Sequence, residues 1–130
     1  MDDTKQINGI RTMEKESKGM KLNEYQELAS RTAKDHGVFN KNLAEYGMGV
    51  SEEGGEVCGI IKKVVFHGHD LERESVAKEL GDVMWYVSQT ARLIGYTLQE
   101  VAEMNVAKLE KRYPMGFSTF DSIKRVDVND

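Results

Sequence analysis

Apolar residues that recur every three or four positions are the feature that most constrains the fold of this chain. Between residues 73 and 94 they form one helical stripe, made of Val76, Leu80, Val83, Val87 and Ala91. The same spacing runs through residues 41–66, and no segment shows the strict alternation of a half-buried strand. The pattern therefore predicts an all-α fold.

Two shorter helices are predicted on either side of this long pair. The first begins at Asn23, its predicted N-cap, and stops at Gly37. The last follows Thr97, its predicted N-cap, and ends before Pro114, because proline cannot continue a helix. Four amphipathic helices with short connections predict an antiparallel four-helix bundle.

Length and composition indicate one folded domain. The chain has 130 residues, of which 31% are charged and 39% hydrophobic, as in ordinary globular proteins. We expect the domain to span residues 21–117, between a polar arm (1–20) and a C-terminal tail (118–130). No apolar run approaches the roughly 18 residues of a membrane span, and no secretory signal is recognisable, so we expect a cytoplasmic protein without membrane contact. The net charge of -4 argues against a nucleic-acid partner.

Two acidic pairs hold matching positions in the two long predicted helices. Residues 53–57 read EGGEV and residues 79–83 read ELGDV, so each pair has its acids three positions apart, with glycine directly before the second. Both pairs fall at the edge of the apolar stripe, where an unpaired charge is unfavourable. The predicted metal ligands are Glu53, Glu56, Glu79 and Asp82.

Converging carboxylates favour a hard divalent cation. Mg²⁺ prefers such oxygen ligands, and Mn²⁺ is an allowed substitute. Without a cation, mutual repulsion would raise the pKa of some of these acids. A ferritin-like di-iron site is disfavoured because it uses Glu-x-x-His pairs, which neither motif contains. Taken alone, either acidic pair is more typical of a solvated helix face, and it is the matching phase of the two pairs that favours a metal site.

With these motifs, the sequence resembles the MazG family of nucleotide pyrophosphohydrolases, within the all-α NTP pyrophosphatase group. The family pattern is E-x-x-E followed by E-x-x-D, and the stretches EYQELASRT, ELGDVMWYV and NVAKLEKRYPMGF extend the similarity over about residues 22–117. The resemblance implies Mg²⁺-dependent hydrolysis of (deoxy)nucleoside triphosphates at the α–β phosphoanhydride bond, giving nucleoside monophosphate and pyrophosphate. It also implies that the four acids are catalytic, with Glu56 or Glu53 able to accept a proton, and that the protein is a homodimer or homotetramer.

Other residues are candidates for substrate binding. Asn105, Lys108 and Arg112 share one stripe of the last predicted helix, and lysine and arginine suit phosphate. On spacing alone, the stripe is more typical of a solvated basic face. The family resemblance favours substrate binding for Asn105 and Lys108 and leaves both interpretations open for Arg112. Lys63 could contact a phosphate, and Tyr25 and Gln26 could stack beside the base. Trp85 and Tyr86 could stack on a base, but aromatic residues at helical spacing more often belong to the core, and we predict a core position for Trp85.

Two other functions remain compatible with the sequence. A non-catalytic bundle whose acids bind a structural ion or a basic protein would act as an interaction module. A phosphoribosyl-ATP pyrophosphohydrolase would share the four acids, so the motif does not distinguish that substrate from a nucleoside triphosphate.

Overall fold

The computed structural model describes residues 19–128, and every regular element in this range is a helix, which confirms the all-α prediction. None of these helices combines the length and apolar character needed to cross a membrane. The polar arm predicted for residues 1–20 lies outside the described residues except for residues 19 and 20. The helices in chain order are α2 (Leu22–Ser30), α3 (Phe39–His67), α4 (Arg73–Leu93), α5 (Leu98–Arg112) and α6 (Thr119–Lys124).

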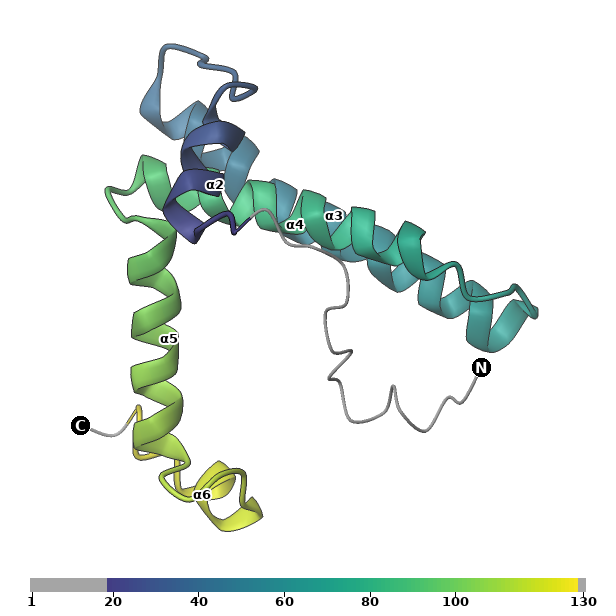
Figure 1. Cartoon of the computed structure of the whole chain (residues 1–130), viewed down its shortest axis with the longest axis vertical. Coiled ribbons are helices and arrows are strands. Elements are labelled where there is room, and N and C mark those ends of the chain that lie inside the picture. Colours follow the sequence, from purple (N-terminus) through teal and green to yellow (C-terminus); the bar gives the residue numbers. More distant parts are fainter. Residues whose placement is uncertain (1–18, 129–130) are drawn as a thin grey trace.

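The two long helices, α3 and α4, form an antiparallel hairpin (Figure 1). Their bounds agree with the predicted segments to within two residues, and α3 continues without a break through its glycines. The hairpin turns at Gly68, whose φ of 71° is left-handed and whose N–H donates to the carbonyl of Lys63. Glycine adopts this conformation without a Cβ clash, so it ends α3 efficiently.

The helices of the hairpin approach each other closely at Gly49. A Cβ built there would overlap the ring of Tyr86 on α4, so only glycine allows this approach. The Tyr86 ring lies edge-on to Trp85, with centroids 4.9 Å apart, and Trp85 in turn contacts the buried Tyr46 at 5.8 Å. Edge-to-face contacts of this kind favour a defined register between α3 and α4.

The core lies at the open end of the hairpin, where α2 packs across α4. The indole N–H of Trp85 donates to the carbonyl of Ala29 at 3.1 Å and to the hydroxyl of Thr32 at 3.0 Å. Trp85 is half-buried, and its indole N–H is used to hold α2 against α4. The buried hydrophobic side chains among residues 19–128 lie in this region: Ala29, Tyr46, Ala91 and Leu98.

The short helix α2 starts and ends earlier than predicted. Its N-cap is Lys21 and it ends at Ser30, so the predictions of Asn23 as N-cap and of a stop at Gly37 were wrong. Asn23 lies inside α2, and its side-chain oxygen accepts a hydrogen bond from the N–H of Gln99, 3.0 Å away in the first turn of α5. Asn23 was predicted to cap α2, but its side chain instead accepts from an N–H group at the start of α5.

The start of α5 is held by two helices at once. Its predicted N-cap is confirmed, since the Thr97 hydroxyl accepts from the N–H of Glu100 at 3.1 Å. The side-chain oxygen of Gln26 on α2 accepts from the N–H of Leu98 at 3.0 Å. The first N–H groups of a helix have no partner within it, so these bonds fix where α5 begins relative to α2.

From this junction α5 runs away from the hairpin (Figure 1). All four predicted helices are present in the predicted order, but only α3 and α4 lie side by side along their length. The helix α5 contacts α2 and α4 near the junction. Among residues 19–128, no other long helix packs along the length of α5.

A further helix, α6, follows in the segment predicted as a C-terminal tail. The Ser118 hydroxyl caps it by accepting from the N–H of Asp121 at 3.0 Å, and this Ser-x-x-Asp spacing was a readable signal. Arg112 at the end of α5 pairs with the carboxylate of Asp127, which has no exposed side-chain surface, at 3.5 Å. This segment is therefore folded back onto the end of α5.

Candidate metal centre

The hairpin brings together three of the four predicted acids. Glu53 comes from α3, and Glu79 and Asp82 come from α4; each offers a carboxylate oxygen within 4.8 Å of the others. The first two are half-buried and Asp82 is exposed. Antiparallel packing produces this convergence, because it places the middle of α3 beside the first half of α4.

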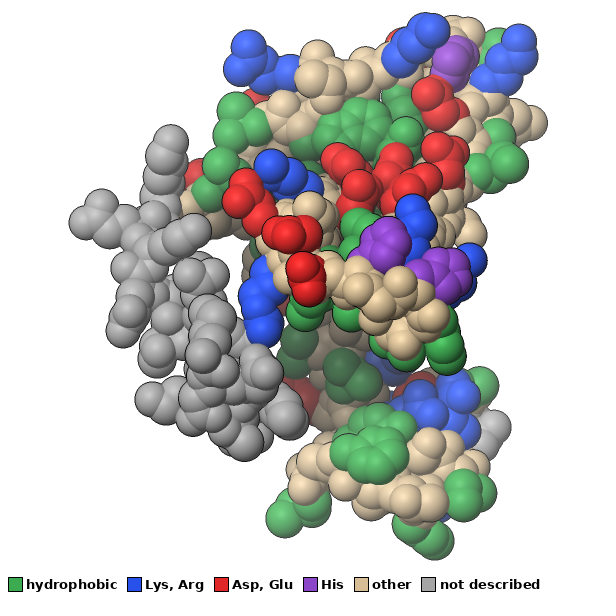
Figure 2. Space-filling view, turned by 90° about the vertical axis from the view of Figure 1, so that its right-hand side faces the viewer, with side chains coloured by type: hydrophobic (Ala, Val, Ile, Leu, Met, Phe, Trp, Pro, Cys, Tyr) green, Lys and Arg blue, Asp and Glu red, His purple; other side chains and the backbone are tan. Residues whose placement is uncertain are grey.

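The electrostatics of the cluster are those of crowded negative charges. Partial burial raises the pKa of Glu53 above its usual value, and the charges of Asp82 and Glu79 raise it further. Figure 2 shows acidic side chains gathered over the hairpin, with histidine, lysine and arginine side chains around them. A divalent cation between the carboxylates would relieve this repulsion.

The fourth predicted acid, Glu56, lies outside this group of three. It is exposed, one helical turn from Glu53. Its charge contributes to the raised pKa of Glu53, as the smallest of the contributions from nearby acids. The structure therefore separates Glu56 from the other three acids, at the rim of the cluster.

Two tyrosines border the acids. The hydroxyl of Tyr25 donates to the carbonyl of Gly81 at 3.5 Å, and burial followed by the charge of Asp82 raises its pKa. Burial also raises the pKa of Tyr86, with smaller contributions from acids that include Glu53 and Asp82. Both hydroxyls are therefore protonated at neutral pH, and their O–H groups are potential donors to an anionic ligand.

Gln26, predicted to frame a base, is instead part of the helix junction. Its side-chain nitrogen donates to the carbonyls of Ser88 at 2.9 Å and Tyr96 at 3.1 Å, while its oxygen accepts from Leu98. The residue is buried. Its amide is thus already used to hold α2, α4 and α5 together.

The basic candidates are not assembled with the acids in one chain. Asn105 and Lys108 are exposed on the second half of α5, the half that extends away from the hairpin. Lys63 is exposed on α3, ten residues from Glu53 and hence about 15 Å along the helix axis. Arg112 is engaged with Asp127, as described above.

The donor set has a clear chemical preference. Three carboxylates on two packed helices offer hard oxygen ligands to a divalent cation such as Mg²⁺ or Mn²⁺, so the residues present fit such an ion. Fold and centre together define an all-helical protein with an acidic hairpin whose carboxylates fit a divalent cation.

The chain belongs to the MazG nucleotide pyrophosphohydrolase family. The model of the MazG nucleotide pyrophosphohydrolase domain matches residues 41–117, more than half of the chain, including both acidic pairs. The chain is also similar to the gene 37 protein of Mycobacterium phage L5, with 33% identity over 105 residues that cover 75% of this chain and 92% of that protein. No solved structure matches. The resemblance seen in the sequence is therefore confirmed, and the chain is a pyrophosphohydrolase by class.

Sequence reasoning missed a group of polar residues at the open end of the hairpin. Gln89 is only 1% exposed although it carries a polar amide, and it lines a pocket with Arg92 and with residues of the loop between α2 and α3. No sequence signal set Gln89 apart from a surface glutamine. Its burial depends on α2, which covers it.

Proposed function

We propose that this protein hydrolyses nucleoside triphosphates, or their deoxy forms, between the α- and β-phosphorus, with Mg²⁺ as the cation. The products are a nucleoside monophosphate and pyrophosphate. The observation that supports this most directly is the convergence of Glu53, Glu79 and Asp82 on one hairpin in a chain of the MazG family.

The chemistry assigns different tasks to these groups. When bound, a divalent ion supplies charge that offsets the triphosphate and lowers the pKa of a water molecule. Water attacks the α-phosphorus, the bond to the bridging oxygen breaks, and pyrophosphate leaves. Glu56 lies outside the group of three ligands, one turn from Glu53. We therefore assign it the role of general base, which accepts the proton that the attacking water releases.

We also propose that the working unit is a homodimer or homotetramer. Asn105 and Lys108 suit phosphate, but α5 carries them away from the acids of their own chain. A second copy would let α5 gain a neighbouring helix and bring positive charge toward an acidic hairpin. Exposed large apolar side chains on the α3–α4 hairpin and on α5 support such packing. They include Ile61, Val65, Leu80, Met84, Met104, Val106 and Leu109.

A nucleotide panel tests the activity directly. The common ribo- and deoxyribonucleoside triphosphates and phosphoribosyl-ATP are incubated with Mg²⁺, with Mn²⁺ and without divalent ions, and products are separated by chromatography. We expect monophosphate and pyrophosphate only when a divalent ion is present.

Two variants connect this activity to the hairpin. Glu53→Gln and Asp82→Asn remove charge without changing shape, and each should lower kcat/KM by roughly 100-fold or more, because metal-assisted charge stabilisation is worth several kcal/mol. Glu27→Gln, at an exposed acid of α2, is the matched control and should retain activity. Wild-type rates in both acid variants would exclude this centre.

The same panel separates the competing functions. Cleavage of phosphoribosyl-ATP alone would assign that substrate instead. A folded protein that binds Mg²⁺ in a calorimetric titration but hydrolyses nothing would be an interaction module.

A further inference from the structure

A polar pocket of about 340 Å³ opens beneath the loop that connects α2 to α3. Loop residues form one wall, α3 forms a second, and the end of α4 forms a third. Its volume is within the range of small-molecule sites. The polar residues that line it are Lys34, Asp35, Asn42, Tyr46, Gln89 and Arg92.

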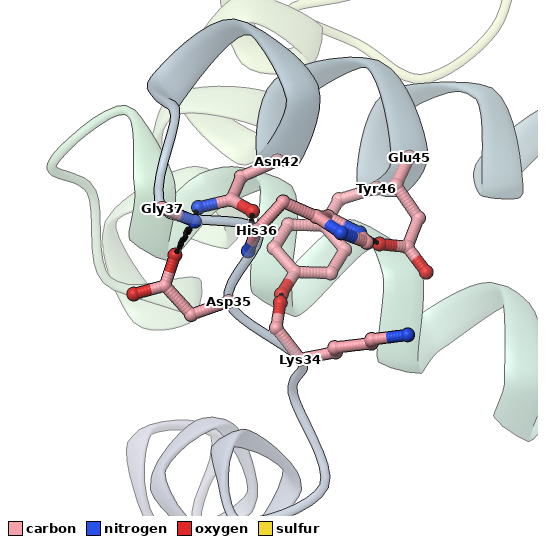
Figure 3. A network of polar contacts seen from close by, with 7 residues as sticks. All are labelled: Lys34, Asp35, His36, Gly37, Asn42, Glu45 and Tyr46. Atoms are coloured by element: carbon pink, nitrogen blue, oxygen red, sulfur yellow. Dashed lines mark hydrogen bonds and ion pairs between the residues drawn. The ribbon is translucent and has the colours of Figure 1, made fainter.

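The loop wall is held in place by hydrogen bonds within the loop and to α3 (Figure 3). One carboxylate oxygen of Asp35 accepts from the N–H of Gly37 at 2.7 Å and from the amide of Asn42 at 3.0 Å. The Asn42 oxygen accepts from the N–H of His36 at 2.8 Å, and the hydroxyl of Tyr46 donates to the carbonyl of Lys34. The bonds from Asn42 and Gly37 lower the pKa of Asp35, so this wall carries a fixed negative charge.

Other groups of the pocket have unused bonding capacity. The side-chain oxygen of Gln89 is buried and has no hydrogen-bond partner among residues 19–128, although its nitrogen donates to the carbonyl of Gln26. The side chains of Lys34 and Arg92 are exposed, and neither forms an ion pair within the described part of the chain. A buried acceptor without a donor is unfavourable, so a ligand that donates there would bind favourably.

The charged and polar groups of the pocket favour a nucleoside over a bare phosphate. A fully ionised phosphate could pair with Lys34 and Arg92, but it would also meet the like charge of Asp35 and would have no hydrogen to donate to the side-chain oxygen of Gln89. A sugar and a heterocyclic base, in contrast, carry O–H and N–H donors for these oxygens. Their ring nitrogens and carbonyl oxygens can accept from the guanidinium of Arg92.

The position of the pocket relative to the acids supports the same ligand. Gln89 follows Asp82 by seven residues on α4, and Tyr46 precedes Glu53 by seven on α3. Seven residues are two helical turns, about 10 Å along the same face, a separation comparable to the length of a nucleoside. Tyr86 lies between the two places, one turn after Asp82.

We infer that this pocket binds the nucleoside part of the substrate, and that Gln89 and Arg92 are its specificity-determining residues. The inference rests on the proposed function, since it places the phosphates at the acidic centre and the base beneath the loop. Gln89 accepts a hydrogen bond from the base or sugar, and Arg92 donates one to the base.

Kinetics of Arg92→Gln test this assignment against Lys78→Gln, which removes a positive charge from an exposed position elsewhere on α4. For the best nucleotide of the panel, we expect Arg92→Gln to raise KM about tenfold, as for loss of one charged hydrogen bond, while kcat changes by less than about threefold. Gln89→Met, of similar size, should change the ratio of kcat/KM between nucleotides that differ only in the base. Unchanged KM and unchanged ratios, with wild-type hydrolysis intact, would overturn the assignment and leave the proposed function standing.

Binding without turnover provides the second readout. Nucleoside monophosphates are titrated calorimetrically into the protein without divalent ions, where the acidic centre contributes little. Weaker binding by Arg92→Gln than by Lys78→Gln supports the pocket even if no triphosphate is hydrolysed, in which case the proposed function alone fails. Equal binding by the two variants, or no binding by the wild-type protein, counts against the pocket.

Discussion

At the scale of single residues, Glu53 combines partial burial with crowding by other acids. Its pKa is raised first by desolvation and then by Asp82 and Glu79. A carboxylate in this position destabilises the folded chain when it is ionised and unpaired. The hairpin thus keeps an unfavourable charge where a cation would make it favourable, as is common at functional sites.

The unfavourable charge of Glu53 should make the stability of the metal-free protein depend on pH. Because the pKa of Glu53 is higher in the folded than in the unfolded chain, its stabilising contribution is fully present below the unfolded value of roughly 4.3 and is lost as pH rises through the folded value. We therefore expect Glu53→Gln to raise the Tm at pH 7 in the presence of a chelator. The gain should disappear below about pH 4.

Thermal melts from pH 3 to pH 8 give the measurement, with Glu27→Gln as the control for simple loss of surface charge. Addition of Mg²⁺ should reverse the order at pH 7, because only the wild-type protein retains the full ligand set. A lower Tm for Glu53→Gln at pH 7 without metal would show that Glu53 has a stabilising partner.

At the scale of helices, the register of the hairpin depends on one glycine more than on the others of α3. Gly49 is buried against the Tyr86 ring, whereas Gly47, two positions earlier, has open space where a Cβ would stand. Helix propensity alone favours alanine at both positions. The two sites therefore separate tertiary packing from local preference.

Gly49→Ala should lower the free energy of unfolding by about 1–3 kcal/mol, as overpacking does, and should disturb the Tyr86 ring near the acids. Gly47→Ala should instead raise it by up to about 1 kcal/mol. Urea denaturation followed by circular dichroism measures both values. Equal gains in the two variants would mean that α3 and α4 do not approach closely at Gly49.

At the scale of the whole molecule, the buried core is small and one-sided. The buried residues of the described part of the chain gather at the junction of α2, α3, α4 and α5. Apolar side chains on the far part of the hairpin and on α5 remain exposed, among them Val65, Phe66 and Met104 at 63%, 79% and 58%. Apolar surface of this extent is typical of an interaction face.

Light scattering at micromolar concentration should therefore give the mass of a dimer or tetramer. Met104→Glu places a charge on the exposed face of α5 and should shift the population toward monomer, because burying an unpaired charge at an interface is unfavourable. A monomer in the wild-type protein would contradict the proposed assembly and would leave Asn105 and Lys108 without a route to the acids.

The sequence by itself determined the features that depend on local periodicity. Helical spacing predicted α3 and α4 to within two residues, and the capping box at Thr97 placed the start of α5. The phase of the acids relative to the apolar stripe predicted that all four acids converge, and the structure brings three of them together, Glu53, Glu79 and Asp82. These properties repeat every turn of a helix, so neighbouring residues are enough to reveal them.

Only the tertiary structure decided how distant segments complete one another. Asn23 and Gln26 satisfy N–H groups of α5 more than seventy residues later, and Gln89 is buried because α2 covers it. Glu56 lies at the rim of the acidic cluster, although its acidic pair has the same spacing as the pair formed by Glu79 and Asp82. Such outcomes depend on which surfaces meet, and on which polar groups lose water when they do, so a local pattern carries no record of them.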